Sequence, residues 1–461
     1  MNLVNAYHSL PYPLKTLAAS IHGYRLRWWR YGSNTEKLVE ETLERDHWSR
    51  DQWKTWQDEQ LAFILHRAAT QVPYYRDQWQ KRRALGDKSS WEVLANWPIL
   101  DKSQVRDNPT AFISETSRKK LLYVDHTGGT TGRPTLIYES RKTIIKWYAI
   151  YEARIRRWHN LDYHERWGIL GGQKIIPLSQ KVPPFWVLNQ GLNQIYFSIF
   201  HISETTAESY VNALWKYRPT HLMVYPSTCA VLARHMILLG LQPPKIKAII
   251  TNSEKLTRDY KELIIEAFNC PVYDTYGMAE LTAAASECDQ GGLHYWPETG
   301  VLEVFNHENN TITSNTDQTG NLLMTGLLNE DMPLIRYMNK DIGQLPDWSK
   351  NCDCHRTLPI IPKIIGRNND LIKTKDGRQL YILDSLYNGL PIIEGQMIQK
   401  DLDNFEVNVI PDNQYDRDLV YDEIQERLKY YLGDIQLSVC EVKNLQQNTN
   451  GKAKPFVSLI G

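Results

Sequence analysis

Residues 127–134 read Thr-Gly-Gly-Thr-Thr-Gly-Arg-Pro and follow a short apolar run at residues 121–124. The three glycines let the backbone turn tightly and point several N–H groups at one place, and three threonine hydroxyls add hydrogen-bond donors. Such a concave set of N–H groups suits phosphate oxygens. The stretch is not a Walker loop, because no Gly-Lys-Ser/Thr ends it. By itself it is compatible with a phosphate-binding loop or with a polar turn.

Short apolar runs alternate with helical patterns on the C-terminal side of this loop. The runs at 121–124 and 247–250 are followed by segments of helical periodicity at 141–157 and 257–268. This alternation predicts parallel α/β layers. Between residue 271 and about residue 358, short strands separated by Asn, Asp and Gly turns predict an antiparallel sheet or barrel.

The predicted fold class is α/β, or α+β for the chain as a whole. A large N-terminal domain would comprise a helical part at residues 1–120 and a core of α/β layers with a distorted β-barrel at 121–366. A small α+β C-terminal domain would follow at 367–461 and include a helix at 417–432. The polar stretch at 367–370 is the predicted linker.

Composition excludes several classes of protein. Lys plus Arg (53) equals Asp plus Glu (53) among 461 residues, so no overall electrostatic field favours nucleic acid. The N-terminus lacks a secretory pattern, and no run approaches about 18 apolar residues. Six cysteines in so long a chain do not indicate a disulfide scaffold. We therefore expect a cytoplasmic protein without a nucleic-acid partner.

The N-terminal segment at residues 1–33 is locally asymmetric. It carries Lys15, Arg25, Arg27 and Arg30 together with several Trp and Tyr residues, and it has no acidic residue. Two interpretations remain open: a helix packed across the domain with solvated arginines, or a segment that lies weakly on a membrane surface.

A second stretch, residues 274–280, reads Asp-Thr-Tyr-Gly-Met-Ala-Glu and follows a strand-like run. The Tyr276 ring can stack on a base, Asp274 can accept from an exocyclic amine, and Glu280 can reach Mg²⁺. The alternative is an ordinary Tyr-Gly turn with an acidic first helical turn behind it.

Together the two stretches resemble signatures of the adenylate-forming superfamily, which includes acyl-CoA synthetases, adenylation domains and luciferases. Three further stretches follow in the expected order, at 334–341, 365–370 and 449–452. Within the superfamily, three features are similar to phenylacetate–CoA ligase-like proteins, and to the subset encoded with capsule and exopolysaccharide genes: Tyr74-Tyr75, Gly291-Gly292-Leu293-His294 and Cys352-Asp353-Cys354.

The resemblance implies an AMP-forming acid–thiol ligase. With ATP and Mg²⁺ it would convert a carboxylic acid to an acyl-adenylate, release pyrophosphate, and transfer the acyl group to CoA or another acceptor. Two alternatives stay open: an acyl-adenylate transferase that acts on a sugar amine or hydroxyl in polysaccharide biosynthesis, and a relative that binds ATP without catalysis. The expected partners are the acid and its acceptor, with a weak membrane or polysaccharide-assembly association, and the chain would be a monomer or homodimer.

The resemblance also implies site residues. Catalysis is assigned to Lys452, Glu280 and Thr130, with Glu280 as the Mg²⁺ ligand and Asn369 as the hinge between domains. The substrate pocket is assigned to two turns that contain Gly171, Gly172, Tyr225 and Ser227. Nucleotide binding is assigned to Thr127, Gly128, Gly129, Thr130, Thr131, Gly132, Ser253, Glu254, Asp274, Thr275, Tyr276, Gly277, Asp341 and Arg367.

Four positions depart from the family pattern. Gly128, Arg133 and Ala279 stand where Ser, Lys and Thr are usual, and Asn369 stands where Asp or Lys is common. Arg133 keeps the charge of a lysine but not its shape. Ala279 lacks a hydroxyl that can contact phosphate or substrate, so slower catalysis or an altered geometry is expected.

Four residues form a predicted structural zinc site: Cys288, His294, Cys352 and Cys354. A Cys₃His set suits tetrahedral Zn²⁺, and four protein ligands would leave no open position for catalysis. The resemblance supports this set, because similar ligases carry Cys and His at the corresponding turns. His355 is a competing ligand, and the alternative is two buried thiols with an unrelated pair in a loop.

Overall fold

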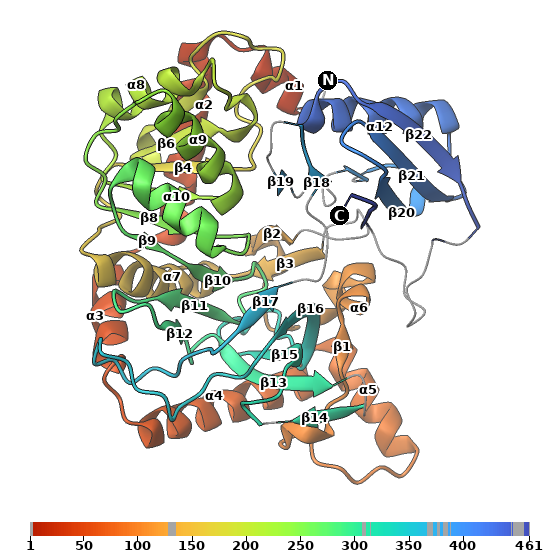
Figure 1. The fold of residues 1–461 in the computed structure, drawn as a ribbon. Helices are drawn as coiled ribbons and strands as arrows, with labels where there is room; N and C mark the ends of the chain where they lie inside the picture. Colours follow the sequence, from red (N-terminus) through yellow and green to blue (C-terminus); the bar gives the residue numbers. More distant parts are fainter. Residues whose placement is uncertain are drawn as a thin grey trace. The chain divides into compact units, whose positions relative to one another are not determined.

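The computed structural model describes residues 3–127, 135–306, 310–313, 315–366, 372–375, 379–380, 386–387, 389–443, 445 and 456–460. The chain forms two compact units (Figure 1). One comprises Met1–Asp125 and Ile137–Gly366, and the other comprises His126–Leu136 and Arg367–Gly461. No helix in the described ranges combines the length and the apolar character needed to cross a membrane.

The first unit begins with helices, as the sequence predicts. Helix α4 starts in a capping box, in which Ser49 Oγ accepts from Gln52 N at 3.3 Å and Gln52 Oε1 accepts from Ser49 N at 2.8 Å. Pro73 opens the next helix, where its missing N–H costs nothing. The bounds are α1 (Leu3–His8), α2 (Tyr12–Arg30), α3 (Thr35–Arg45), α4 (Arg50–Gln71), α5 (Pro73–Ala84), η1 (Leu94–Asn96), β1 (Leu100–Asp101), α6 (Lys102–Asp107), η2 (Pro109–Phe112) and η3 (Lys119–Leu121).

A six-stranded sheet forms the α/β layer, in the order β5-β6-β4-β7-β8-β9. All neighbouring strands are parallel except β5, which is antiparallel to β6. Its strands consist almost wholly of buried residues, as expected for a sheet covered on both faces. The elements are β4 (Trp167–Gly171), β5 (Trp186–Asn189), η6 (Gln190–Leu192), β6 (Gln194–Ser198), η7 (Ile199–His201), α8 (Ala207–Tyr217), β7 (His221–Val224), α9 (Pro226–Leu238), β8 (Ala248–Thr251), α10 (Arg258–Phe268) and β9 (Val272–Tyr273).

The prediction for the strand before the glycine-rich loop is wrong in two respects. The strand, β2 (Tyr123–Thr127), starts two residues later than the apolar run, because residues 119–121 form a 3₁₀ turn. Among the described strands it pairs with β3 (Thr135–Glu139) and not with the parallel sheet. The predicted helix that follows ends early: α7 (Arg141–Tyr151) passes into a π-helical turn, η4 (Glu152–Arg156), and the 3₁₀ turn η5 (Arg157–His159).

Antiparallel sheets follow residue 271, as predicted. A three-stranded sheet has the order β10-β11-β12, and a curved six-stranded sheet has the order β1-β16-β15-β13-β14, with β17 paired to β16. Register shifts in the β15–β16 and β16–β17 pairs bend this sheet into a half-barrel. The strands are β10 (Thr275–Gly277), β11 (Ala284–Glu287), β12 (Leu293–Tyr295), β13 (Gly300–Asn306), β14 (Thr311–Thr313), β15 (Gly320–Gly326), β16 (Tyr337–Gly343) and β17 (Ile364–Gly366).

A buried network of ion pairs joins three segments of the first unit: the end of α3, the turn η4 and the segment before β13. The Arg154 guanidinium donates to Asp46 Oδ1 at 2.8 Å and to both Glu298 carboxylate oxygens at 2.7 and 2.9 Å. Arg45 donates to Glu298 at 3.0 Å. Because Arg154 is fully buried, loss of either acid would leave an uncompensated charge in the core.

The second unit is α+β, as predicted. Its four-stranded sheet has the order β22-β21-β20-β23, and its helix α12 (Arg417–Leu432) matches the predicted bounds. Asp416 Oδ1 caps the helix by accepting from Asp418 N and Leu419 N at 3.1 Å each. The strands are β18 (Ile372–Lys373), β19 (Gln379–Leu380), β20 (Ile392–Gln399), β21 (Asn404–Pro411), β22 (Gln436–Glu441) and β23 (Phe456–Ser458).

Candidate active site and metal centre

The carboxyl ends of the parallel strands bring together the residues assigned to the acid pocket. Gly171 ends β4, and Tyr225 N donates to Leu170 O at 3.1 Å. A side chain at Gly171 would meet the Tyr196 hydroxyl at 2.7 Å, so the close approach requires glycine there. Open α/β sheets bind ligands at this edge, and the edge therefore has the position expected for a substrate pocket.

Two further assigned residues meet at the same edge. Ser227 lies in the first turn of α9, and its N–H donates to Glu254 Oε2 at 3.1 Å. Burial raises the pKa of Glu254, and the hydrogen bonds from Ser227 partly offset this effect. Ser253 precedes Glu254 in a left-handed backbone conformation with φ of 67°, and it is exposed.

Asp274 stands directly after β9 and is held by its neighbours. Its Oδ1 accepts from the Thr251 hydroxyl at 2.7 Å and from Thr275 N at 2.9 Å. The Thr275 hydroxyl donates to Thr251 O at 2.6 Å, which joins the end of β8 to β10. Burial raises the pKa of Asp274 to about 6. The carboxyl group is therefore fixed in position at the strand ends.

Tyr276 and Asp341, which are 65 residues apart in sequence, form a direct hydrogen bond. The Tyr276 hydroxyl donates to Asp341 Oδ2 at 2.8 Å. Asn339 Nδ2 donates to the same oxygen at 2.8 Å, and Asp341 N donates back to Asn339 Oδ1 at 2.9 Å. Two residues assigned to nucleotide binding thus lie in one constellation. Sequence reasoning missed Asn339, although it belongs to the quoted stretch at 334–341.

Glu280 is buried and has two partners that sequence reasoning missed. Tyr337 donates its hydroxyl to Glu280 Oε1 at 2.6 Å, and the Lys102 ammonium lies 3.4 Å from the same oxygen. Tyr337 opens β16, and Lys102 opens α6, directly after β1. Because β1 pairs with β16, the sheet brings residues from two distant segments to this carboxylate.

The donor set around Glu280 is compatible with Mg²⁺ bound mainly through a nucleotide. Proteins commonly hold Mg²⁺ through one or two carboxylates together with substrate phosphates and water. Glu280 supplies one such carboxylate, and the Lys102 ammonium beside it adds positive charge for phosphate oxygens. In the described ranges, Glu280 does not belong to any group of three or more metal-ligating residues.

Several assigned residues lie outside the described residues. They are Gly128, Gly129, Thr130, Thr131, Gly132, Arg133, Arg367, Asn369 and Lys452. Thr127 is the last residue of β2, and Gly277 pairs with Ala284 in β10–β11. A Cβ atom added at Gly172 would meet the Tyr225 hydroxyl at 3.3 Å.

The four predicted zinc ligands come together in one cluster. Their ligand atoms all lie within 4.8 Å of one another. Cys288 Sγ lies 3.5 Å from Cys352 Sγ, and Cys354 Sγ lies 3.3 Å from His294 Nε2. A tetrahedral ion with Zn–S bonds of about 2.3 Å would separate two sulfurs by about 3.8 Å, so only a small expansion is needed.

The surroundings of the cluster orient its histidine. His294 Nδ1 donates to Leu358 O at 2.9 Å, which directs Nε2 toward the sulfurs. His355 is not part of the cluster; it has φ of 62°, and its N–H donates to Cys352 O at 3.0 Å in a turn. Trp53 and Trp158 pack against the cluster. The cluster thus contains the four predicted ligands and not the competing His355.

Comparison with known proteins identifies the family. Residues 54–310, more than half of the chain, match the family of AMP-binding enzymes. The chain belongs to the AMP-binding enzyme family. This finding confirms the resemblance to adenylate-forming enzymes.

Relatives of this AMP-binding enzyme include phenylacetate–CoA ligase-like proteins. Protein CapK of Staphylococcus aureus is 27% identical over 400 residues, which cover 83% of this chain and 84% of CapK. Phenylacetate-coenzyme A ligase of Aromatoleum evansii is 23% identical over 437 residues, which cover 89% of this chain and 95% of that ligase. A crystal structure of 2-hydroxyisobutyryl-CoA ligase with 2-HIB-AMP and CoA matches with a TM-score of 0.58 at 19% identity. The match covers 90% of this chain and 91% of the ligase chain. The last comparison confirms the fold.

Proposed function

We propose that this protein is an AMP-forming acid–CoA ligase. It uses ATP to convert a carboxylic acid to an acyl-adenylate with release of pyrophosphate, and then transfers the acyl group to CoA. The observation that supports this most strongly is the constellation at the edge of the half-barrel, where Tyr276 meets Asp341 and where Tyr337 and Lys102 meet Glu280. The family match and the CoA ligases among the relatives support the same reaction.

The chemistry requires neutralisation of charge. A carboxylate oxygen attacks the α-phosphorus of ATP, and the bond to the β-phosphate bridging oxygen breaks as pyrophosphate leaves. Two anions approach each other in this step, so preorganised positive groups and N–H donors lower its barrier. In this proposal Glu280 holds Mg²⁺, Asp341 accepts from the ribose hydroxyls, and Lys452 and the loop at 127–132 contact phosphate oxygens. The small domain turns about Asn369 before the CoA thiol attacks the acyl carbon and AMP leaves.

The direct test is pyrophosphate exchange with a library of carboxylic acids. We expect one class of acid to drive exchange, and the Asp341→Asn variant to raise the KM for ATP by about tenfold, since it weakens a charged hydrogen bond. The exposed Asp317→Asn is the matched control and should leave this KM unchanged. Absence of exchange with every acid while ATP still binds would favour the non-catalytic alternative. Product analysis with CoA and with amino sugars then identifies the acceptor.

We propose that the cluster of Cys288, His294, Cys352 and Cys354 binds a structural Zn²⁺. The ligand-atom spacing and the His294–Leu358 hydrogen bond support this assignment. With all four ligands from the protein, the ion would join the β11–β12 hairpin to the loop at 352–354. A reducing cytoplasm, which keeps thiolates available for metal, fits both this site and the use of ATP.

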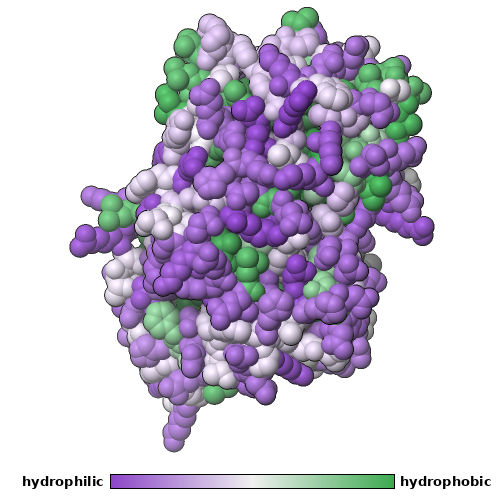
Figure 2. All heavy atoms as spheres, turned by 90° about the vertical axis from the view of Figure 1, so that its left-hand side faces the viewer, coloured by the Kyte–Doolittle hydropathy of each residue, from purple (hydrophilic) through white to green (hydrophobic). Residues whose placement is uncertain are grey.

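We also propose that helix α2 attaches the protein weakly to an anionic membrane surface. Large apolar side chains at positions 14, 17, 21, 24 and 28 share one face of the helix, opposite the buried Lys15 and Gly23. They are Leu14, Leu17, Ile21, Tyr24 and Trp28, which are 47%, 54%, 62%, 57% and 56% exposed. Figure 2 shows one face of the molecule, on which hydrophobic residues form separate patches within a mostly hydrophilic surface.

The charges beside this apolar face support an anionic lipid partner. Arg25 and Arg27 are exposed on its two sides, and α2 contains no acidic residue. Helices that lie in the membrane interface combine such basic residues with Trp, Tyr and Leu. Attraction to acidic headgroups adds to burial of the apolar face and weakens with salt.

Vesicle co-sedimentation tests the membrane proposal. The protein should bind vesicles of phosphatidylglycerol and phosphatidylcholine more tightly than vesicles of phosphatidylcholine alone. A double variant, Leu17→Glu with Ile21→Glu, should bind about tenfold more weakly or worse, because it places charges in the apolar face. Leu85→Glu, at an 87% exposed position elsewhere, is the control. If the double variant changes the oligomeric mass and not vesicle binding, this face contacts a second copy and the membrane proposal is wrong.

A further inference from the structure

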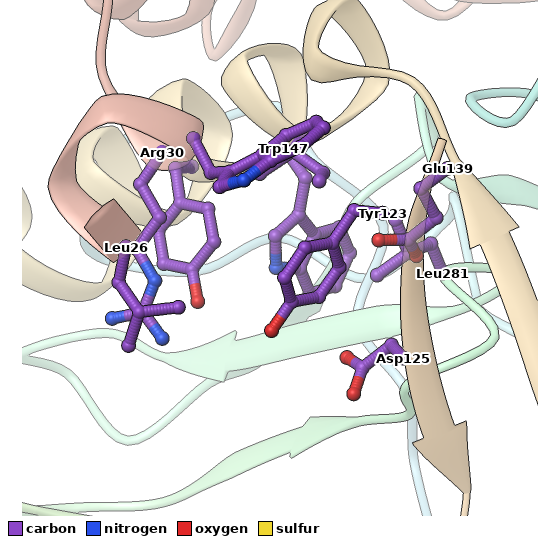
Figure 3. A pocket seen from close by; sticks show the side chains of 10 residues that line it. Leu26, Arg30, Tyr123, Asp125, Glu139, Trp147 and Leu281 are labelled. Atoms are coloured by element: carbon purple, nitrogen blue, oxygen red, sulfur yellow. The ribbon is translucent and has the colours of Figure 1, made fainter. Parts of the chain in front are cut away.

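A cavity of about 70 Å³ lies between helices α2 and α7 and strands β2 and β3 (Figure 3). Aromatic rings of Tyr123, Trp147 and Tyr148 form much of its wall. Two carboxylates, Asp125 on β2 and Glu139 on β3, line it as well. Its volume accommodates several non-hydrogen atoms but not a nucleotide.

The Glu139 carboxyl group is the unusual feature of this cavity. The residue is 4% exposed, and its Oε1 is buried without a hydrogen-bond partner among the described residues. Figure 3 shows the Glu139 carboxylate turned toward the Tyr123 ring. A buried carboxylate without a partner is costly, so such a group in a native protein requires an explanation.

The charges around Glu139 are predominantly negative. Burial raises the pKa of Glu139 well above its usual range, and the nearby Asp125 and Asp331 carboxylates raise it further. The cation that lines the cavity, Arg30, stands over the Tyr148 ring at 4.6 Å. The ammonium groups of two nearby lysines lie 3.0 and 3.4 Å from Glu330; they are Lys142 and Lys146. A ligand that brings positive charge to Glu139 would therefore offset the free-energy cost of burying this carboxylate among other negative charges.

We propose that this cavity binds the ammonium group of an amine-bearing substrate, between the carboxylates of Glu139 and Asp125 and the neighbouring aromatic rings. Aromatic faces attract organic ammonium groups. Mg²⁺ and Ca²⁺ held by only two carboxylates would need several waters to complete their coordination, and a cavity of about 70 Å³ walled by aromatic rings leaves little room for them. The cavity also adjoins the proposed catalytic residues, because its wall residue Leu281 directly follows Glu280.

The assignment to a substrate rests on the proposed function, since the amine belongs either to the activated acid or to the acyl acceptor. An acid with an amino group would place its ammonium in the cavity during adenylation. An amine acceptor would enter it in its ammonium form after adenylation and form an amide. The ammonium first gives one proton to a carboxylate or to water; the free amine nitrogen then attacks the acyl carbon, the bond from that carbon to AMP breaks, and the nitrogen gives its second proton to a carboxylate or to water. Both sources share the same ammonium recognition.

Equilibrium dialysis tests the recognition itself. The wild-type protein should bind ethanolamine as its ammonium form and should bind ethylene glycol, an uncharged molecule of similar size, at least about tenfold more weakly. Glu139→Gln should lower ethanolamine affinity about tenfold or more. Glu208→Gln makes the same change at an exposed position outside the cavity wall, so it should leave the affinity unchanged.

A second variant keeps the test valid if Glu139→Gln fails to fold. Leu26→Trp fills the cavity from α2 without changing either carboxylate, and it should also abolish ethanolamine binding. Equal binding of ethanolamine and ethylene glycol, or an undiminished affinity in both variants, would overturn the proposal.

Two kinetic measurements separate the sources of the amine. If the acid carries it, amino acids should drive pyrophosphate exchange, and Glu139→Gln should raise their KM while the KM for ATP stays constant. If the acceptor carries it, exchange with simple acids should be unchanged in Glu139→Gln, while amide formation with amino sugars falls. Wild-type protein without any exchange would refute the ligase function, and the dialysis result would still decide whether the cavity binds an ammonium group.

Discussion

The Lys452→Ala variant is expected to lose pyrophosphate exchange by a factor of about 10²–10³, the usual cost of removing one preorganised charge from a transition state. Lys452 lies in the Asn450-Gly451-Lys452 stretch of the C-terminal segment. Its ammonium would neutralise the phosphate oxygens as the acid carboxylate attacks, and this contact strengthens only in the transition state. The measurement is the initial rate of exchange at saturating ATP and acid.

The control distinguishes a catalytic contact from a general change of charge. Lys443→Ala removes an exposed lysine from the same unit and should leave exchange near the wild-type rate. ATP affinity and thermal stability should be nearly the same in both variants. Exchange by Lys452→Ala at the wild-type rate would show that a different cation performs this task.

Removal of zinc should have the second large effect. Protein purified without chelators is expected to contain about one zinc per chain, and Cys352→Ser should lose it together with on the order of 3 kcal/mol of stability, because metal binding contributes folding free energy directly. In a domain of this size, that loss corresponds to roughly 3–6 °C in Tm. Elemental analysis and calorimetry measure the two quantities.

Cys440→Ser is the matched control for this prediction. Cys440 lies in β22, away from the cluster in sequence and in a different unit. The control should keep both zinc and Tm. Wild-type protein without zinc, or equal loss of zinc in the two variants, would contradict the assignment.

Local patterns predicted the parts of the fold that depend on local physics. Helix α12 has the predicted bounds for two local reasons. Asp416 caps its N-terminus, and its buried residues Val420, Ile424 and Leu428 recur at helical spacing. The sheet of the strand before the glycine-rich loop was predicted wrongly, because it depends on pairing and not on the local pattern. An apolar run looks the same whether it joins a parallel sheet or a separate hairpin, and only pairing with β3 decides between them.

The candidate site likewise contains residues that the sequence predicted and residues that only the structure revealed. The stretches that contain Tyr276, Glu280 and Asp341 were recognisable because their residue types and order resemble one superfamily. The partners Lys102 and Tyr337 were not, since Lys102 reaches Glu280 only through the pairing of β1 with β16. The cavity at Glu139 draws its walls from α2, the β2–β3 pair, α7 and Leu281, and no local pattern connects these segments.

The sequence by itself thus determined the fold class, the family and the identities of the four residues in the Cys/His cluster, because these follow from residue types, spacing and order. The tertiary structure decided which groups meet: Tyr276 with Asp341, Lys102 with Glu280, and His294 with the three thiols. Within the part of the chain that the structure describes, it also decided which buried group has no hydrogen-bond partner, as for Glu139 Oε1. Hydrogen bonds and ion pairs act over a few ångströms, and contacts at that range between distant segments exist only once the sheets have formed their register.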